Sequence, residues 1–300
     1  MTRKPQSTLL PDLSLLFAAT LWGIFWYPLR LFEASGMSAI WVTLMAFAAA
    51  GSLGLAYTWH IRKEYFLQPA RLLVIAITAG WCNVGFLLAV AEGNVIRVVL
   101  LFYISPIWAV LLGHLILNEY LSLRSFMLFI LAFAGAMIML WNPSIGFPWP
   151  QDIPEWLALS AGFTFALSNV LIRSLQQVSI PVKTTSTWIG GIVIAAIWVM
   201  ISGDSLPDVT HSVWLYSLLL GYVGIFFMGI TVQYGITHMP VYRSATILLF
   251  EVVVTALSAY FIINETMTLL EWLGGIIVLL SGWLLARSSS DHLPGDEHGK

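Results

Sequence analysis

Long apolar segments alternate with short polar ones along the whole chain. Ten apolar segments can be delimited. A helix needs about 20 apolar residues to cross a bilayer, and each segment is of about that length. The pattern therefore predicts an all-α integral membrane protein with ten transmembrane helices. The segments lie near residues 11–32, 38–59, 70–91, 95–117, 123–141, 154–174, 182–202, 213–236, 242–263 and 268–286.

The fourth segment recurs as the ninth, 146 positions later. Arg97 recurs as Arg243, and the pair Asn118-Glu119 recurs as Asn264-Glu265. Five segments per half is an odd number, so the second half should cross the membrane in the opposite direction to the first. We therefore expect two inverted five-helix repeats, a common transporter architecture with the substrate site between the halves. The predicted boundaries are a first repeat over 1–141, a linker over 142–153, a second repeat over 154–287 and a disordered cytoplasmic tail over 288–300.

Pro106 stands in the middle of the fourth segment, where a transmembrane helix is deepest. Proline cannot donate a backbone hydrogen bond, so the helix should be weakened there. Lipid cannot replace the missing bond, and packed neighbouring helices must do so. The ninth segment has Glu251-Val252 where the fourth has Ser105-Pro106. The two copies therefore cannot form a strictly symmetric site.

Composition excludes several classes of protein. The chain is 59% hydrophobic and only 9% charged, whereas soluble domains carry about 25% charged residues. A net charge of −2 without a basic stripe gives no case for a nucleic-acid partner. The single cysteine, Cys82, cannot form a disulfide framework, and no metal or other cofactor is expected. The first apolar segment is too long for a signal peptide and lacks a cleavage site, so we interpret it as a retained span.

Lys and Arg predict the orientation, because cytoplasmic loops carry an excess of them. With the N-terminus inside, eleven of the 13 basic residues fall on the inner side and only Arg30 and Arg97 fall outside. Both termini are therefore expected in the cytoplasm. The inner residues are Arg3, Lys4, Arg62, Lys63, Arg71, Arg124, Arg173, Lys183, Arg243, Arg287 and Lys300.

Several motifs connect the chain to a known family. The fourth span of each half ends in Asn-Glu, the tenth contains Gly274-Gly275, and the first contains Leu21-Trp22-Gly23. With these motifs the chain resembles the EamA-type exporters of the drug/metabolite transporter superfamily over nearly its whole length. The run from Arg97 to Trp108 is similar to aromatic amino acid exporters of the YddG type. This resemblance implies export of small amphipathic metabolites, above all aromatic and other apolar amino acids.

Glu251 is the most informative candidate for the substrate site. It lies near the centre of the ninth segment, where an ionised side chain is costly and should face protein or water. It shares a helical face with Ser244, Thr255 and Ser258, at three-to-four spacing. Glu251 could contact a substrate amine or take up a proton. Alternatively it stays protonated and hydrogen-bonds a neighbouring helix.

Other candidates combine aromatic, small and amide groups on single helical stripes. Such stripes suit a ligand with an apolar ring and a polar end. Ordinary helix packing, in which small residues allow close approach, is the alternative for each of them. We favour Asn83 over Trp81 in the third segment, because an amide is costlier in lipid. The predicted substrate-binding residues are Trp22, Trp26, Asn83, Tyr103, Pro106, Phe165, Asn169, Tyr222, Gln233 and Glu251.

Charged residues at the segment ends suggest contacts between helices. Glu92 and Arg97 could form a gate pair or a loop contact. We interpret Glu119 and Glu265 as structural residues that bond the next helix.

The sequence favours a transporter over an enzyme, because it contains no H-E-x-x-H, G-x-S-x-G or Cys-His metal cluster. A nucleotide carrier would need Lys or Arg deep in its spans, and a channel would need rings of charge. The sequence shows neither feature, which argues against both classes. The alternative function is a multidrug or other-metabolite exporter coupled to protons through Glu251. The expected partners are a small-molecule substrate and the lipid bilayer, and the sequence gives no oligomeric state.

Overall fold

The computed structural model describes residues 9–141, 149–264 and 266–288, and all regular elements in these ranges are helices. Residues 142–148 of the predicted linker lie outside the described residues. Glu265 and residues 289–300 of the predicted tail also lie outside them. The elements are α1 (Leu9–Ile24), α2 (Trp26–Ala34), α3 (Ala39–Thr58), η1 (Trp59–Phe66), α4 (Pro69–Glu92), α5 (Val95–Phe102), α6 (Ser105–Leu117), α7 (Leu123–Leu140), α8 (Ile153–Ser174), α9 (Ile180–Ser202), α10 (His211–Leu219), η3 (Leu220–Ile225), α11 (Phe226–His238), α12 (Val241–Leu248), α13 (Phe250–Ile263) and α14 (Leu269–Ser288).

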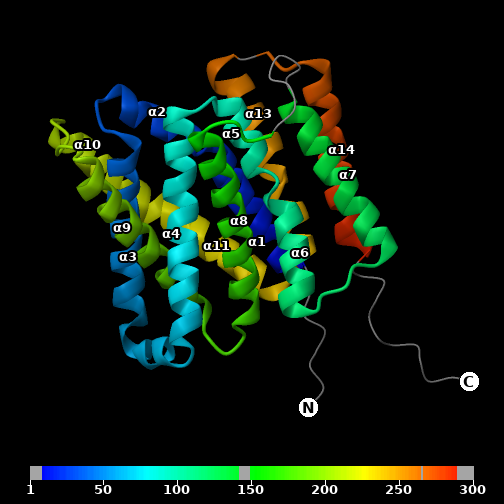
Figure 1. Ribbon diagram of the computed structural model, residues 1–300, viewed down its shortest axis with the longest axis horizontal. Coiled ribbons are helices and arrows are strands. Elements are labelled where there is room, and N and C mark those ends of the chain that lie inside the picture. The colour runs from blue at the N-terminus through cyan, green and yellow to red at the C-terminus, as the bar shows by residue number, and fades with distance from the viewer. Residues whose placement is uncertain (1–8, 142–148, 265, 289–300) are drawn as a thin grey trace, which may run out of the picture.

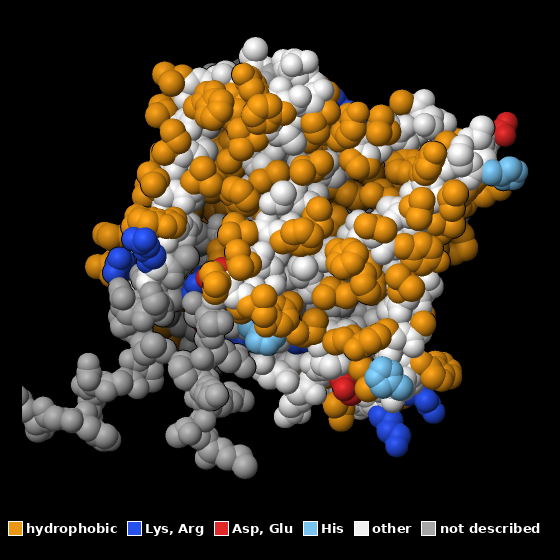
Figure 2. All heavy atoms as spheres, turned by 180° about the vertical axis from the view of Figure 1, so that it is seen from behind, with side chains coloured by type: hydrophobic (Ala, Val, Ile, Leu, Met, Phe, Trp, Pro, Cys, Tyr) orange, Lys and Arg blue, Asp and Glu red, His pale blue; other side chains and the backbone are white. Residues whose placement is uncertain are grey.

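The all-α membrane fold predicted from the sequence is confirmed. Nine helical segments among the described residues are long and apolar enough to cross a membrane, and α14 adds a shorter apolar stretch, Leu269–Leu285. Some of these segments comprise two consecutive helices, as in α5 with α6 and α12 with α13. Apolar side chains cover most of the face seen in Figure 2, and charged ones gather toward its margins. This surface matches a protein whose solvent is lipid.

Local chemistry explains where several helices begin and end. Proline occupies the first turn of α4, α6, α8 and α9, where its missing N–H would be unpaired in any case. The Asp152 side chain caps α8 by accepting from the Glu155 amide at 3.0 Å. Asn118 and Asn264 end α6 and α13 with the same left-handed conformation, φ 54°. Asparagine tolerates this region better than most residues, so the repeated Asn-Glu motif is a repeated helix stop.

The two halves interlock through equivalent contacts. The first span of each half packs against the third and fourth spans of the other: α1 against α11, α12 and α13, and α8 against α4, α5 and α6. The second spans, α3 and α9, pack together, as do the fifth spans, α7 and α14. In Figure 1, α1 begins and α14 ends at the bottom of the molecule. We call this end the lower end and the opposite end the upper end.

The fourth spans run in opposite directions, as the odd number of spans per half predicts. Figure 1 shows that α6 ends at the lower end and α13 at the upper end. The Asn118 and Asn264 caps therefore lie at opposite ends of the bundle. This antiparallel arrangement, together with the reciprocal packing, is the inverted repeat.

Candidate functional site

Both fourth spans are broken at equivalent positions in the middle of the bundle. The first break falls after α5 at Tyr103, and the second after α12 at Leu249, 146 positions later. Pro106 follows the first break, as expected, but the second occurs without any proline. At Leu249 the backbone tightens to a bond from the Val252 amide to the Leu249 carbonyl, 3.1 Å long. The discontinuity therefore belongs to the architecture, not to proline alone.

Glu251 and Tyr103 meet where the two breaks lie side by side. Glu251 stands in the first turn of α13, and its carboxyl group is an electrostatic neighbour of the Tyr103 hydroxyl. Cys82 of α4 is an electrostatic neighbour of the same carboxyl group and is buried. Glu251 is only half-buried, although Val252 and Val253 beside it are buried in the core. The Glu251 side chain thus lies at the middle of the bundle and is still partly accessible.

An aromatic cluster adjoins this pair. The Phe102 ring lies 4.6 Å from Phe86 of α4, 5.7 Å from Tyr103 and 5.8 Å from Phe165 of α8, measured between ring centroids. Phe165 was predicted from the sequence, whereas Phe102, which joins the other three rings, was not. Its position next to Tyr103 at the helix break was the one available signal. The cluster provides an apolar aromatic wall beside a carboxyl group.

The two predicted tryptophans lie where the first span is itself broken. Helix α1 gives way to α2 at Phe25, and the Trp22 ring contacts Phe25 at 5.4 Å. Trp26 reaches across to the ninth span, where its Nε1 donates to the Ser258 hydroxyl at 2.9 Å. Gly23 permits this approach, because a Cβ there would lie 2.7 Å from the Cβ of Val254. Trp26 and the predicted polar face of α13 are therefore in contact.

The remaining predicted residues are more dispersed. Asn83 is half-buried and donates to the Ala79 carbonyl of its own helix at 2.7 Å. Asn169 and Pro106 are buried, as is Gln233, whose Oε1 has no partner among the described residues. Tyr222 is 38% exposed in η3 and takes no part in the ring contacts that join the others. The structure thus brings Tyr103, Phe165 and Glu251 together, and leaves Tyr222 apart.

The suggested contact between Glu92 and Arg97 is wrong. Arg97 is buried and forms its ion pair with Glu155 at the start of α8. Glu92 is exposed at the end of α4. The error arose because Glu92 is close in sequence, whereas Glu155 is brought near only by packing between the halves.

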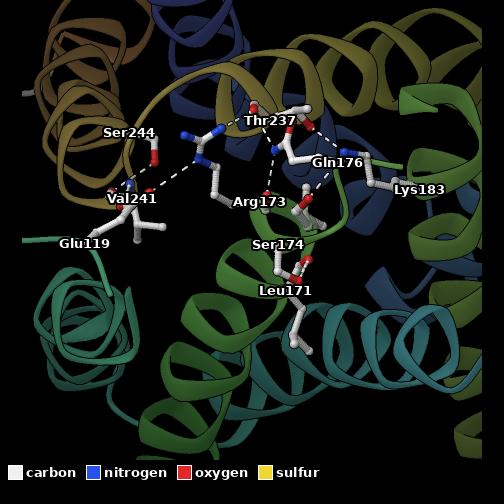
Figure 3. Close-up of polar contacts among 10 residues, drawn as sticks. Glu119, Leu171, Arg173, Ser174, Gln176, Lys183, Thr237, Val241 and Ser244 are labelled. Atoms are coloured by element: carbon white, nitrogen blue, oxygen red, sulfur yellow. Dashed lines mark hydrogen bonds and ion pairs between the residues drawn. The ribbon is translucent and has the colours of Figure 1, made fainter. Parts of the chain in front are cut away.

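A polar network ties the halves together at the lower end, as Figure 3 shows. Glu119 accepts from the Val241 amide at 2.7 Å and pairs with Arg173 at 3.4 Å. Arg173 in turn donates to the Thr237 carbonyl at 2.7 Å. Glu119 therefore joins the end of α6 to the start of α12 and the end of α8. This is the structural role expected for it.

Lys183 completes this network from a fully buried position. Its ammonium donates to the carbonyls of Ile172 and Leu175 and to the Thr237 hydroxyl, at 3.2–3.3 Å and 2.8 Å. The two carbonyls belong to the C-terminal end of α8, which carries partial negative charge. Lys183 is thus a cap on α8, and its described partners include no carboxylate.

Glu119→Ala is expected to destabilise the protein, and Glu119→Gln much less so. Alanine leaves the Val241 amide and the Arg173 guanidinium without this acceptor, which costs about 1–3 kcal/mol for a buried group. Glutamine keeps one oxygen for the Val241 amide. Thermal unfolding of the purified protein in detergent would show the difference. Equal melting temperatures for the two variants would contradict the structural role.

Comparisons with known proteins agree with this architecture. The EamA-like transporter family matches residues 9–141 and 153–287, which is most of the chain in two segments. An uncharacterized transporter of Pseudomonas aeruginosa is 25% identical over 197 residues, which are 63% of this chain and 62% of the relative. One of Synechocystis is 27% identical over 236 residues, 74% of this chain and 66% of the relative. The match thus spans less than two thirds of the length of either relative.

Two further comparisons extend the likeness. An uncharacterized transporter of Archaeoglobus fulgidus is 23% identical over 223 residues, which are 73% of this chain and 77% of that protein. A crystal structure of a protein superposes on 92% of this chain and 98% of its own, with a TM-score of 0.73 and 17% identity. At that identity the superposition bears on the fold alone.

Proposed function

Since the chain belongs to the EamA-like transporter family, we propose that it is a secondary transporter that exports small amphipathic metabolites, namely aromatic and other apolar amino acids. In this proposal a central site is exposed to one side of the membrane at a time, as the two halves move against each other. The inverted repeat supports this, because broken helices that cross between inverted halves are a usual setting for a transport site.

The observation that carries the substrate class is the pairing of a carboxyl group with aromatic rings. The Glu251 carboxyl group, which lies near the Tyr103 hydroxyl, can accept hydrogen bonds from a substrate ammonium. Phe102 and Phe165 offer ring faces and edges for an aromatic side chain. An amino acid with an aromatic side chain has both features that this site would recognise.

The proposed site comprises the residues predicted from the sequence, with Phe86 and Phe102 added from the structure. In this proposal Trp26 holds the ninth span against α2, and Asn83, Asn169 and Gln233 supply polar groups as the halves separate. The proposed substrate-binding residues are Trp22, Trp26, Asn83, Phe86, Phe102, Tyr103, Pro106, Phe165, Asn169, Tyr222, Gln233 and Glu251, of which Tyr222 lies outside the ring cluster.

The proposed setting is the bacterial inner membrane with both termini in the cytoplasm. The distribution of basic residues supports it, as does the common end of the molecule at which α1 begins and α14 ends. The proposed domains are repeats over 1–141 and 154–287, joined by 142–153. The two family matches, which leave out 142–152, accord with this division.

The second candidate is a multidrug or other-metabolite exporter coupled to protons through Glu251. A carboxyl group is costly to ionise at mid-membrane and can alternate between binding a proton and binding a cationic substrate. The position of Glu251 at the break of α13 favours this candidate equally. Only the range of substrates and the effect of a proton gradient separate the two.

Counterflow in proteoliposomes would test the proposal. Vesicles loaded with unlabelled phenylalanine or tryptophan should accumulate the labelled amino acid, and charged amino acids should compete poorly. The assay is run at two pH values, with and without a proton gradient. Accumulation that is unaffected by the gradient supports facilitated flow, whereas gradient-driven accumulation supports proton coupling of amino acid transport. Absence of counterflow for every amino acid would discard the leading substrate class.

A further inference from the structure

Besides the Arg173–Glu119 pair of the lower network, two ion pairs with buried arginines lie between the halves, one at each end of the molecule. The upper pair joins Arg97 in the first turn of α5 to Glu155 in the first turn of α8. Arg97 binds both carboxylate oxygens, with 2.9 Å from its terminal nitrogen to Oε2, and it also donates to the Trp149 carbonyl at 2.9 Å. The Gln151 amide donates to the same carboxylate at 2.8 Å. This pair is bidentate and well satisfied.

The lower pair joins Arg243 in the first turn of α12 to Asp12 in the first turn of α1. A terminal nitrogen of Arg243 donates to Asp12 Oδ2. The Nε of Arg243 and the Oδ1 of Asp12 are both buried and have no partner among the described residues. Among the described residues this pair therefore rests on a single contact and leaves two polar atoms unsatisfied, which makes it the weaker of the two.

The inverted repeat relates the two pairs to each other. Arg243 follows Arg97 by 146 positions, and Glu155 follows Asp12 by 143, the same offset that relates Arg30 to Arg173. Each pair therefore joins the fourth span of one half to the first span of the other. Figure 1 shows α5 beginning at the upper end and α12 at the lower end. One contact between the halves is thus present twice, once at each end.

We propose that these two ion pairs are latches that release alternately and set the end at which the transporter opens. The proposal rests on alternating access, because each pair must break if the halves separate at its end. Breaking one latch leaves the other in place, so one end stays closed while the other opens. Because the lower latch has one described contact and the upper has at least three, the lower latch is the easier of the two to break. The Glu119 network at the same end must part as well before that end opens.

Thiol labelling at matched positions would test the latches. Leu101 and Ile247 are both buried, lie one turn beyond Arg97 and Arg243, and are themselves 146 positions apart. Each is replaced singly by cysteine in a Cys82→Ala background and labelled with a water-soluble maleimide in detergent, without substrate. We expect Glu155→Gln to raise the labelling rate of Leu101→Cys about tenfold and to leave Ile247→Cys unchanged. Asp12→Asn should do the reverse.

Separate measurements test the difference in strength between the two latches and the pairing of Arg97 with Glu155. The asymmetry is measured in a Glu119→Gln background, which lacks the ion pair between Glu119 and Arg173. With both latches intact in that background, Ile247→Cys should label faster than Leu101→Cys. The double variant Arg97→Glu with Glu155→Arg should restore slow labelling of Leu101→Cys, which a merely destabilised protein would not do. If Glu155→Gln does not elute as folded protein, Arg97→Gln takes its place.

Labelling that rises at both ends, at the wrong end or at neither would overturn the latches. The assay needs no substrate, so its failure is separate from a failure of the amino acid proposal.

Discussion

Glu251→Gln is expected to reduce amino acid counterflow about 10–100-fold, since a hydrogen bond to a charged group contributes about 1.5–3 kcal/mol. Glutamine matches the carboxyl group in size and keeps one acceptor oxygen, but it has no charge to offer a substrate ammonium. It also cannot carry a proton. The loss is therefore expected whether Glu251 binds the substrate amine, couples protons or does both.

Two matched variants make this result specific. Glu33→Gln removes the same charge from an exposed position at the end of α2 and should leave counterflow unchanged. Glu251→Asp keeps the charge on a shorter side chain and should retain part of the activity. If wild-type rates vary with pH and the variation disappears in Glu251→Gln, the proton-coupled candidate is supported. Full activity in Glu251→Gln would remove Glu251 from the site and leave it as a helix contact.

The repeat made most of the fold predictable. The return of Arg97 and Asn118-Glu119 as Arg243 and Asn264-Glu265 identified equivalent spans, and an odd number of spans fixed their opposite directions. These inferences need only the length and apolarity of segments, which the bilayer imposes directly. The Asn residues have identical left-handed caps in both halves. The features that the membrane imposes, namely the spans and their directions, could therefore be predicted from a single sequence.

The break in the ninth span could not be predicted. Pro106 predicts the first break. The second break, at Leu249, has no residue beside it that disrupts a helix by its own chemistry. The second break lies where α13 packs on α1, so closely that a Cβ added at Gly23 would lie 2.9 Å from the Glu251 carbonyl oxygen. Packing between the halves, and not local propensity, accounts for such a feature. Sequence periodicity carries no information about it.

In the candidate site, too, some residues could be predicted from the sequence and others could not. Glu251, Tyr103 and Phe165 were identifiable because polar and aromatic residues deep in a span are unusual. Phe102 was not, since one more phenylalanine in an apolar segment has no distinctive pattern. The true partner of Arg97 was also hidden, because Glu155 lies 58 positions away and reaches it only through reciprocal packing of the halves. Side-chain chemistry marks single residues, but partners depend on the fold.

Gly190→Ala is expected to destabilise the protein by about 3 kcal/mol or more, the upper range for overpacking a close contact. A Cβ at Gly190 of α9 would lie 1.8 Å from the Ala76 carbonyl oxygen of α4. A Cβ at Gly80 would lie 2.4 Å from the Gly190 carbonyl oxygen in the same contact. The obstructing atoms are backbone atoms, so no side chain can rotate away and the two helices must separate.

This separation would weaken the contact between the halves, since α4 belongs to the first and α9 to the second. Transmembrane helices associate mainly through close packing of small residues, because lipid leaves little hydrophobic driving force between them. Gly282→Ala is the matched control: it makes the same change in α14, where no atom lies within 4 Å of the added Cβ. We expect Gly190→Ala to lower the melting temperature and the yield of monodisperse protein, and Gly282→Ala to change neither. Equal stability of the two variants would mean that α4 and α9 are not in backbone contact.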